Sequence, residues 1–139
     1  MRYFSAILIL CVLGLAITSN SCKDTPFEQG KILYENFCAN CHMDDGSGLE
    51  GLIPPVAQAD YYRENLLESA CQIRYGMEGP IQVNGRTYDQ PMPGTDKLTE
   101  FEIANVLNYI NATWYSDLPY VKLQDVRTKL EECKEAREE

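Results

Sequence analysis

The chain has 139 residues, with 12 lysines and arginines against 21 aspartates and glutamates, and a net charge of −9. This length suits one modest domain and is too short for two ordinary ones. An acidic chain of this kind repels nucleic-acid phosphates, so we expect no nucleic-acid partner.

The first 21 residues have the pattern of a secretory signal peptide. Arg2 is followed by an apolar run from Phe4 to Ile17, which ends in small polar residues. This run is shorter than the roughly 20 residues that span a bilayer, which argues against a permanent transmembrane helix. We expect residues 1–21 to direct export and to be removed, which leaves 11 basic and 21 acidic residues and a net charge of −10.

The stretch that ends in Cys22 resembles the cleavage site of a bacterial lipoprotein, at which the cysteine becomes the acylated first residue. It departs from that pattern at Ser19, where an aliphatic residue is usual. The alternative is ordinary cleavage, which would leave an unpaired thiol in an oxidising compartment. We favour acylation, with residues 22–25 as a short linker. The protein would then be exported to the periplasmic side of a bacterial membrane and held there by lipid.

Residues 26–117 are expected to form the folded domain, which opens with a helix that runs into the sequence FCANCH. Thr25 can cap this helix, and Pro26 suits its first turn. One apolar face recurs at helical spacing through Gly30, Leu33, Tyr34, Phe37 and Cys41. The glycine- and proline-rich residues 44–60 that follow are predicted to form a loop.

The only histidine of the chain, His42, directly follows the C-x-x-C pair of Cys38 and Cys41. A redox dithiol would follow a strand of a βαβ unit, and structural zinc needs four ligands, so neither fits well. C-x-x-C-H is instead the attachment motif of c-type haem. Two thiols on one helical turn can bond to the two vinyl groups, and the next residue then presents an imidazole to the iron. We predict thioether bonds from Cys38 and Cys41 and proximal iron ligation by His42.

The sixth iron ligand is predicted to be Met92, since the chain has no second histidine. Met43 adjoins His42 and lies on the proximal side, so it cannot reach across the ring. Met77 is interpreted as a loop or core residue. Met92 is flanked by two prolines, which stiffen a loop and hold its thioether with little ordering cost.

The remainder of the domain carries three clear local signals. Residues 61–76 are predicted to form a helix that ends at its final glycine. Residues 81–88 contain an Asn-Gly pair between two β-prone triplets, which predicts a hairpin. The last domain helix is expected within 98–115, because Thr99 and Glu102 form a capping-box pattern.

The acidic residues 118–139 are expected to form a helical extension. Its apolar stripe consists of Leu123, Val126, Leu130 and Cys133. Cys71 and Cys133 are the two cysteines left after the signal, the anchor and the C-x-x-C pair are assigned. In an exported chain they most simply form a disulfide, although both could be small buried apolar residues.

From about residue 25 to 115 the chain resembles class I c-type cytochromes. The similarity follows, in order, the Gly30 and Tyr34 helix, CANCH, the IPP loop, VNG, MPG and EIANVLNYI. It implies a mainly α cytochrome c fold, with three to four helices around one covalent haem c, a small hairpin on the distal side and an extra C-terminal helix. In this family the first and last domain helices cross. A proline carbonyl, here of Pro54 or Pro55, accepts the free N–H of the proximal imidazole.

These features predict an electron carrier with His/Met ligation rather than an enzyme. Its partners would be exported or membrane-bound oxidases, reductases or dehydrogenases. Two alternatives remain open. One is a gas sensor or peroxidase-like enzyme with a labile sixth ligand. The other is a dedicated haem subunit of a larger oxidoreductase, with the acidic tail as its docking element.

Overall fold

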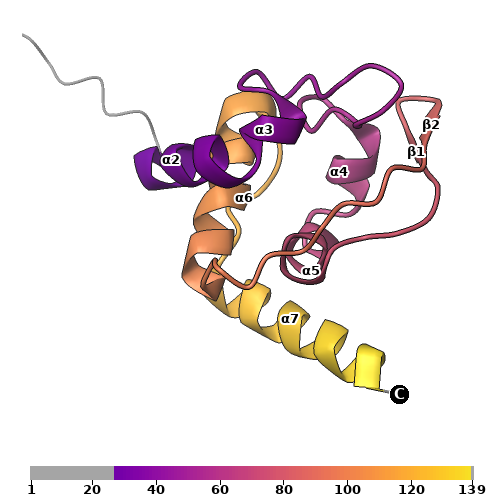
Figure 1. The fold of residues 1–139 in the computed structure, drawn as a ribbon. Coiled ribbons are helices and arrows are strands. Elements are labelled where there is room, and N and C mark those ends of the chain that lie inside the picture. Colours follow the sequence, from indigo (N-terminus) through magenta and orange to yellow (C-terminus); the bar gives the residue numbers. More distant parts are fainter. Residues whose placement is uncertain (1–26, 139) are drawn as a thin grey trace, which may run out of the picture.

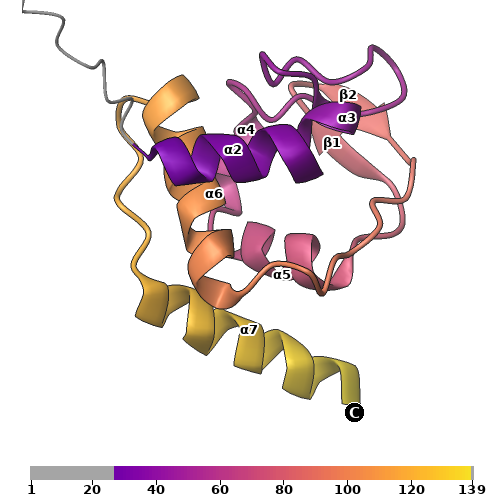
Figure 2. The same ribbon diagram turned by 60° about the vertical axis from the view of Figure 1, so that its left-hand side comes forward.

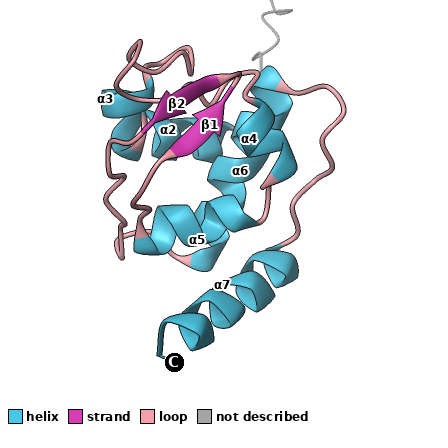
Figure 3. Ribbon diagram, turned by 90° about the vertical axis from the view of Figure 1, so that its right-hand side faces the viewer, coloured by secondary structure: helices cyan, strands magenta, loops and turns pink. Residues whose placement is uncertain are grey.

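The computed structural model describes residues 27–138, which form six helices and one small antiparallel sheet (Figures 1 and 3). The helices are α2 (Glu28–Phe37), α3 (Ala39–His42), α4 (Asp60–Glu64), α5 (Glu68–Tyr75), α6 (Glu100–Trp114) and α7 (Leu123–Glu138), and the strands are β1 (Ile81–Val83) and β2 (Arg86–Tyr88). The predictions for the signal peptide, Cys22 and Thr25 lie outside the described residues. Among the described helices, none is both long and apolar enough to cross a membrane.

The crossing of α2 and α6 forms the centre of the fold (Figure 2). A Cβ on Gly30 would lie 2.1 Å from the carbonyl oxygen of Asn105, so only glycine permits this close approach. Four residues further along α2, the fully buried Tyr34 packs with ring centroids 5.6 Å from Tyr109 and 5.3 Å from Trp114. The predicted crossing of the first and last domain helices is confirmed.

Helix α6 begins where its sequence predicts. The Thr99 hydroxyl accepts a hydrogen bond from the Glu102 backbone, and the Glu102 carboxylate accepts one from the Thr99 N–H at 2.7 Å. This capping box satisfies backbone donors that the first turn leaves unpaired. Beyond it, Ile103, Val106 and Leu107 are fully buried, and each contributes roughly 1.5–3 kcal/mol of hydrophobic stabilisation.

The single helix predicted for residues 61–76 is wrong, because the chain breaks it into α4 and α5 at Asn65. The Asn65 amide donates to the Tyr61 carbonyl at 2.8 Å, and its backbone N–H is shared between the carbonyls of Tyr61 and Tyr62. Asparagine side chains compete in this way with helical backbone hydrogen bonds. The predicted end of α5 at Gly76 is confirmed.

The hairpin is also confirmed, with Asn84 at φ 50° and Gly85 at φ 76° between β1 and β2. Positive φ at both turn residues is the geometry that an Asn-Gly pair favours. The turn is tied to the start of α4, because the Asn84 N–H donates to the Asp60 carboxylate at 2.7 Å and the Asn84 side-chain carbonyl oxygen accepts from the Asp60 N–H.

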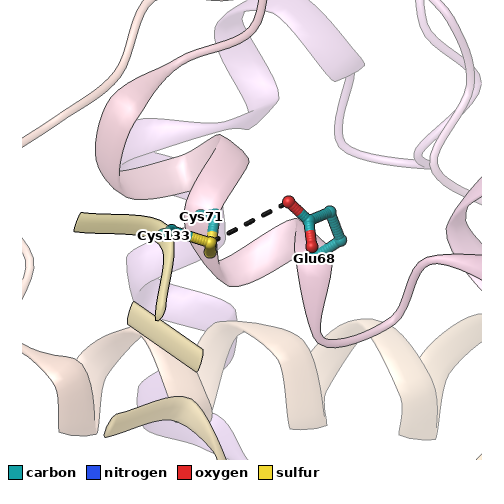
Figure 4. Close-up of side chains that lie close together, drawn as sticks. All are labelled: Glu68, Cys71 and Cys133. Atoms are coloured by element: carbon teal, nitrogen blue, oxygen red, sulfur yellow. Dashed lines mark hydrogen bonds between the residues drawn. A yellow bond between two sulfur atoms is a disulfide. The ribbon is translucent and has the colours of Figure 1, made fainter. Parts of the chain in front are cut away.

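Helix α7 packs beneath α5 and the start of α6, with Val126 and Leu130 buried (Figures 1 and 2). A disulfide joins Cys133 to Cys71 of α5, 62 residues away (Figure 4). Glu68 lies beside it, with its Oε1 3.9 Å from the Cys133 sulfur. A disulfide sulfur has no proton to donate and is no thiolate ligand, so we treat this cluster as packing and not as a metal site.

Candidate haem site

Two adjoining cavities lie between α3, the hairpin, α5 and α6. The more apolar one measures about 650 Å³, its open mouth included, and is lined mostly by apolar side chains. Both cavities are lined by Cys38, His42, Pro54, Met77, Ile81 and Met92. The fold therefore brings the C-x-x-C-H motif, the IPP loop and the MPG loop to one apolar space.

Helix α3 is a single turn that places the motif residues along this cavity. The His42 N–H donates to the Cys38 carbonyl at 2.9 Å, which closes the turn. Cys38 and Cys41 are both free thiols, Cys38 half-buried and Cys41 exposed. Burial, followed by the neighbouring Cys41, raises the pKa of Cys38 to about 12. Because neither sulfur is in a disulfide, both could form thioether bonds.

The imidazole of His42 is oriented by Pro54. Its Nδ1 lies 3.0 Å from the Pro54 carbonyl oxygen. An N–H at Nδ1 makes this a hydrogen bond and leaves the Nε2 lone pair free to bind iron. Burial lowers the pKa of His42, opposed by the Pro54 contact, and so favours the neutral form that a metal requires. Pro55 lines the cavity beside it.

The Pro54 carbonyl is positioned by a tight bend in the loop. Gly48 has φ +67°, and a Cβ there would lie 2.4 Å from the Ile53 carbonyl oxygen. The Gly48 N–H donates to the carbonyl of His42 itself at 3.0 Å, and the Leu49 N–H donates to that of Ile53. The loop is thus closed back onto the histidine that it orients.

Met92 reaches the cavity from an irregular segment between β2 and α6. Around it the chain is anchored to the end of α5: the Thr95 N–H donates to the Ile73 carbonyl at 2.9 Å, and Arg74 donates to the Leu98 carbonyl at 2.6 Å. A Cβ on Gly94 would lie 2.5 Å from the carbonyl carbon of Tyr75. The segment therefore depends on long-range contacts for its shape.

Met77, which its local sequence predicts to be a loop or core residue, lines both cavities. It pairs with Met92 through two backbone hydrogen bonds of 2.9 Å, and its sulfur accepts a hydrogen bond from the Tyr61 hydroxyl at 3.6 Å. The register of the hairpin predicts that Met77 lies opposite Met92. Extending the register Ile81↔Tyr88 outward by four residues on each strand pairs Met77 with Met92.

The residues present fit a covalently attached haem. Two free thiols lie one turn apart, an imidazole has its non-ligating nitrogen satisfied, and a thioether enters the same apolar space from another segment. Neither Cys71 nor Cys133, which form the disulfide, lines either of these two cavities. These features define a class of protein that holds haem through a C-x-x-C-H motif.

A profile of the cytochrome c family matches residues 27–114, and the chain belongs to this family. It is 35% identical over 83 residues to cytochrome c-552 of Thermus thermophilus, which covers 55% of this chain and 62% of that protein. A second cytochrome c-552 sequence of the same species gives the same identity over 55% of each chain. The cytochrome c subunit of quinone alcohol dehydrogenase from Gluconobacter oxydans is 29% identical over 92 residues, 65% of this chain and 19% of that subunit.

The chain thus spans less than two thirds of the length of each of these relatives. Membership of the family implies covalently bound haem c and supports a role in haem electron transfer. It also confirms the cytochrome c fold expected from the sequence. Proteins of this family are typically exported or periplasmic.

Proposed function

We propose that the protein is a single-electron carrier in which His42 and Met92 are the two axial ligands of one haem c bound through Cys38 and Cys41. The observation that supports this most strongly is the meeting of an oriented imidazole and a thioether at one apolar cavity. Haem c supplies a reversible Fe(III)/Fe(II) couple. If His42 and Met92 both bound the iron, no coordination site would be left for a substrate.

The protein residues set the properties of that couple. The Pro54 carbonyl fixes the His42 tautomer and makes the imidazole a better donor. Ligation by Met92 would raise the reduction potential relative to ligation by a second histidine. Buried lining residues such as Val106 and Leu107 exclude water from the site. Electrons would pass at the cavity mouth, where Phe37 and Cys41 are exposed.

We further propose export and attachment to a bacterial membrane through a lipid on Cys22, with residues 22–25 as the linker. Residues 26–117 would form the electron-transfer domain and residues 118–139 its extension. Tethering would raise the effective concentration of the carrier near membrane-bound oxidases, reductases or dehydrogenases. Mass spectrometry of the mature protein tests the anchor. A diacylated N-terminal cysteine is expected, and a chain that begins elsewhere would contradict it.

A dedicated subunit of a dehydrogenase is the second candidate function. It is favoured by the similarity to the cytochrome c subunit of quinone alcohol dehydrogenase. In that case α7 would be the docking element. Exchange of the exposed Glu131 and Glu135 of α7 for lysine, which leaves its buried face and disulfide in place, should then abolish recovery of the complex while the haem potential stays the same. A free carrier would be recovered alone with or without these substitutions.

The experiment that tests the proposed function is a redox titration of haem-matured protein, followed by absorption with and without carbon monoxide. A carrier should show one reversible one-electron transition, and its reduced form should not bind carbon monoxide at neutral pH. Ready binding by the wild type would mean a weak or absent sixth ligand. The protein would then be better described as a gas sensor or a peroxidase-like enzyme.

A further inference from the structure

Met77 and Met92 are direct partners in an antiparallel bridge that continues the hairpin. Each residue donates its N–H to the carbonyl of the other, at 2.9 Å in both directions. In such a hydrogen-bonded pair the two side chains lie on the same face, with Cα atoms about 5.5 Å apart. Consistent with this, both residues line both cavities. The site therefore holds two thioethers side by side.

The two sulfurs differ in what holds them. The Tyr61 hydroxyl donates to the Met77 sulfur at 3.6 Å, and the hydroxyl oxygen itself accepts from Gln72 Nε2 at 3.1 Å. This chain runs from α5 through α4 to Met77. Within residues 27–138, no such hydrogen bond engages the sulfur of Met92. The Met77 thioether is thus held by the Tyr61 hydroxyl, while the Met92 thioether is free to bind a metal.

We propose that Met77 is a reserve axial ligand, and that Tyr61 is a positioning residue that keeps its sulfur from competing with Met92. This inference rests on the proposed function, in which Met92 is the native ligand. A thioether sulfur is a weak hydrogen-bond acceptor. Met77 can therefore give up its contact with Tyr61 when Met92 is missing, and the shared backbone bridge keeps it beside the vacated position.

The test compares haem-matured wild type with Met92→Ala, Met77→Leu and the double variant. Two readouts are used: the charge-transfer absorption that a thioether gives Fe(III), and carbon monoxide binding to the reduced protein. Wild type and Met77→Leu should both show the band, because Met92 is the ligand in each. Met92→Ala should retain a thioether band, supplied by Met77. The double variant should lose the band and bind carbon monoxide freely.

The affinities separate the possible outcomes. If Met77 occupies the position in about nine-tenths of Met92→Ala molecules, carbon monoxide binds this variant about tenfold more weakly than the double variant. Equal affinities, with no band in Met92→Ala, would overturn the reserve role and leave Met92 ligation intact. Loss of the band in Met77→Leu alone would instead overturn the proposed ligation by Met92.

The role of Tyr61 is tested by Tyr61→Phe, which removes only the hydroxyl. In the Met92→Ala background this change should weaken carbon monoxide binding further, because Met77 no longer has a competing partner. A purely structural role would loosen Met77 and strengthen carbon monoxide binding.

If Met92→Ala does not mature, the role of Tyr61 is tested by Tyr61→Phe in the wild-type background. Two low-spin ferric species should appear by electron paramagnetic resonance and return to one when Met77→Leu is added. A single unchanged species would contradict the proposal.

Discussion

The two sides of the haem cavity are built in different ways. On the His42 side, both thiols and the imidazole lie within five consecutive residues, and the Pro54 carbonyl that orients the imidazole is only 12 residues further on. On the Met92 side, the proposed ligand is 50 residues from His42 and lies in no helix or named strand. Its segment is shaped by the end of α5, and α5 is in turn fixed to α7 by a disulfide.

This difference implies that the positions of the two proposed ligands, His42 and Met92, are lost under different conditions. One helical turn and one bend hold the imidazole, so much of that site should survive when distant contacts loosen. Met92 depends on packing among α5, α7 and its own irregular segment. Regions with such few and distant supports are expected to open first. Each prediction below perturbs one side, or the link between the two.

The largest effect is expected from Cys133→Ser, which removes the disulfide between α5 and α7. A bridge across 62 residues contributes about 2–4 kcal/mol to the free energy of unfolding. The Met92 thioether band should be lost at lower denaturant than helical circular dichroism, because α5 supports the Met92 segment. Cys71→Ser is the matched control and should behave identically. An unchanged denaturation midpoint in both variants would contradict this account of α7.

Gly76→Ala should damage the Met92 side next most strongly. Gly76 has φ +78°, and an added Cβ would lie 2.6 Å from the carbonyl oxygen of Met92. The matched control is Gly79→Ala, which also has a positive φ but would meet nothing within 4 Å. Both variants should lose stability through backbone strain at a positive φ. Gly76→Ala should lower the free energy of unfolding in urea by about 1–3 kcal/mol more than Gly79→Ala, because its Cβ also clashes with Met92. Equal losses of stability in the two variants would show that the clash with the Met92 carbonyl does not contribute to the free energy of unfolding.

Thr99→Ala should reduce stability by about 1 kcal/mol, since it removes the cap of α6. Thr99→Ser keeps the accepting oxygen and should restore most of this loss. Helix α6 lines the cavity through Val106 and Leu107, so the two ligands should weaken together here, unlike in the Gly76 variant. Urea unfolding followed at the haem and by circular dichroism should give one midpoint, and separated midpoints would argue against this.

The same cap predicts a pH dependence. Hydrogen bonds from the Thr99 backbone and then its side chain lower the pKa of Glu102 below its usual 4.5. A lowered folded-state pKa means that the stabilisation is present above the unfolded value and is lost as pH falls through the folded one. Melting temperatures of Glu102→Gln and wild type should therefore differ at pH 7 and converge in acid. A constant difference across this range would rule the effect out.

The smallest effect is expected from Arg86→Ala, which breaks the 2.8 Å ion pair between the hairpin and Glu50 of the His42-side loop. Arg86 lowers the pKa of Glu50, but both side chains are largely exposed. Exposed pairs of this kind contribute little and are screened by salt. We expect no change in melting temperature beyond measurement error at physiological salt. A clear drop would mean that this bridge couples the two sides of the cavity.

The sequence predicted the local features well, and it predicted the features that arise from distant contacts poorly. The Asn-Gly hairpin, the Thr99–Glu102 cap and the end of α5 at Gly76 each depend on neighbouring residues, and each is found. The break at Asn65 is not predicted from the sequence, because an asparagine side chain can either bond to the backbone and end a helix or point to solvent within a continuous one. No helical periodicity reveals which choice the chain makes.

The candidate site follows the same division. The C-x-x-C-H motif identifies Cys38, Cys41 and His42 from the sequence alone. Whether Pro54 or Pro55 accepts the imidazole N–H depends on the path of the loop, which only the structure shows. The residues next to Met77 in the sequence do not distinguish it from an ordinary loop or core methionine. Its position became informative only once the hairpin register was extended to Met92, and its contact with Tyr61 joins segments that no local pattern links.

The central claim, that His42 and Met92 together hold the haem iron, is tested most directly by nuclear magnetic resonance. Reduced, haem-matured protein would be labelled with methyl-¹³C methionine and the signals assigned through the backbone. A bound methionine methyl lies against the haem face, so ring currents should shift the Met92 methyl far upfield and leave those of Met43 and Met77 closer to ordinary positions. A far-upfield methyl from another methionine, or none at all, would contradict the account.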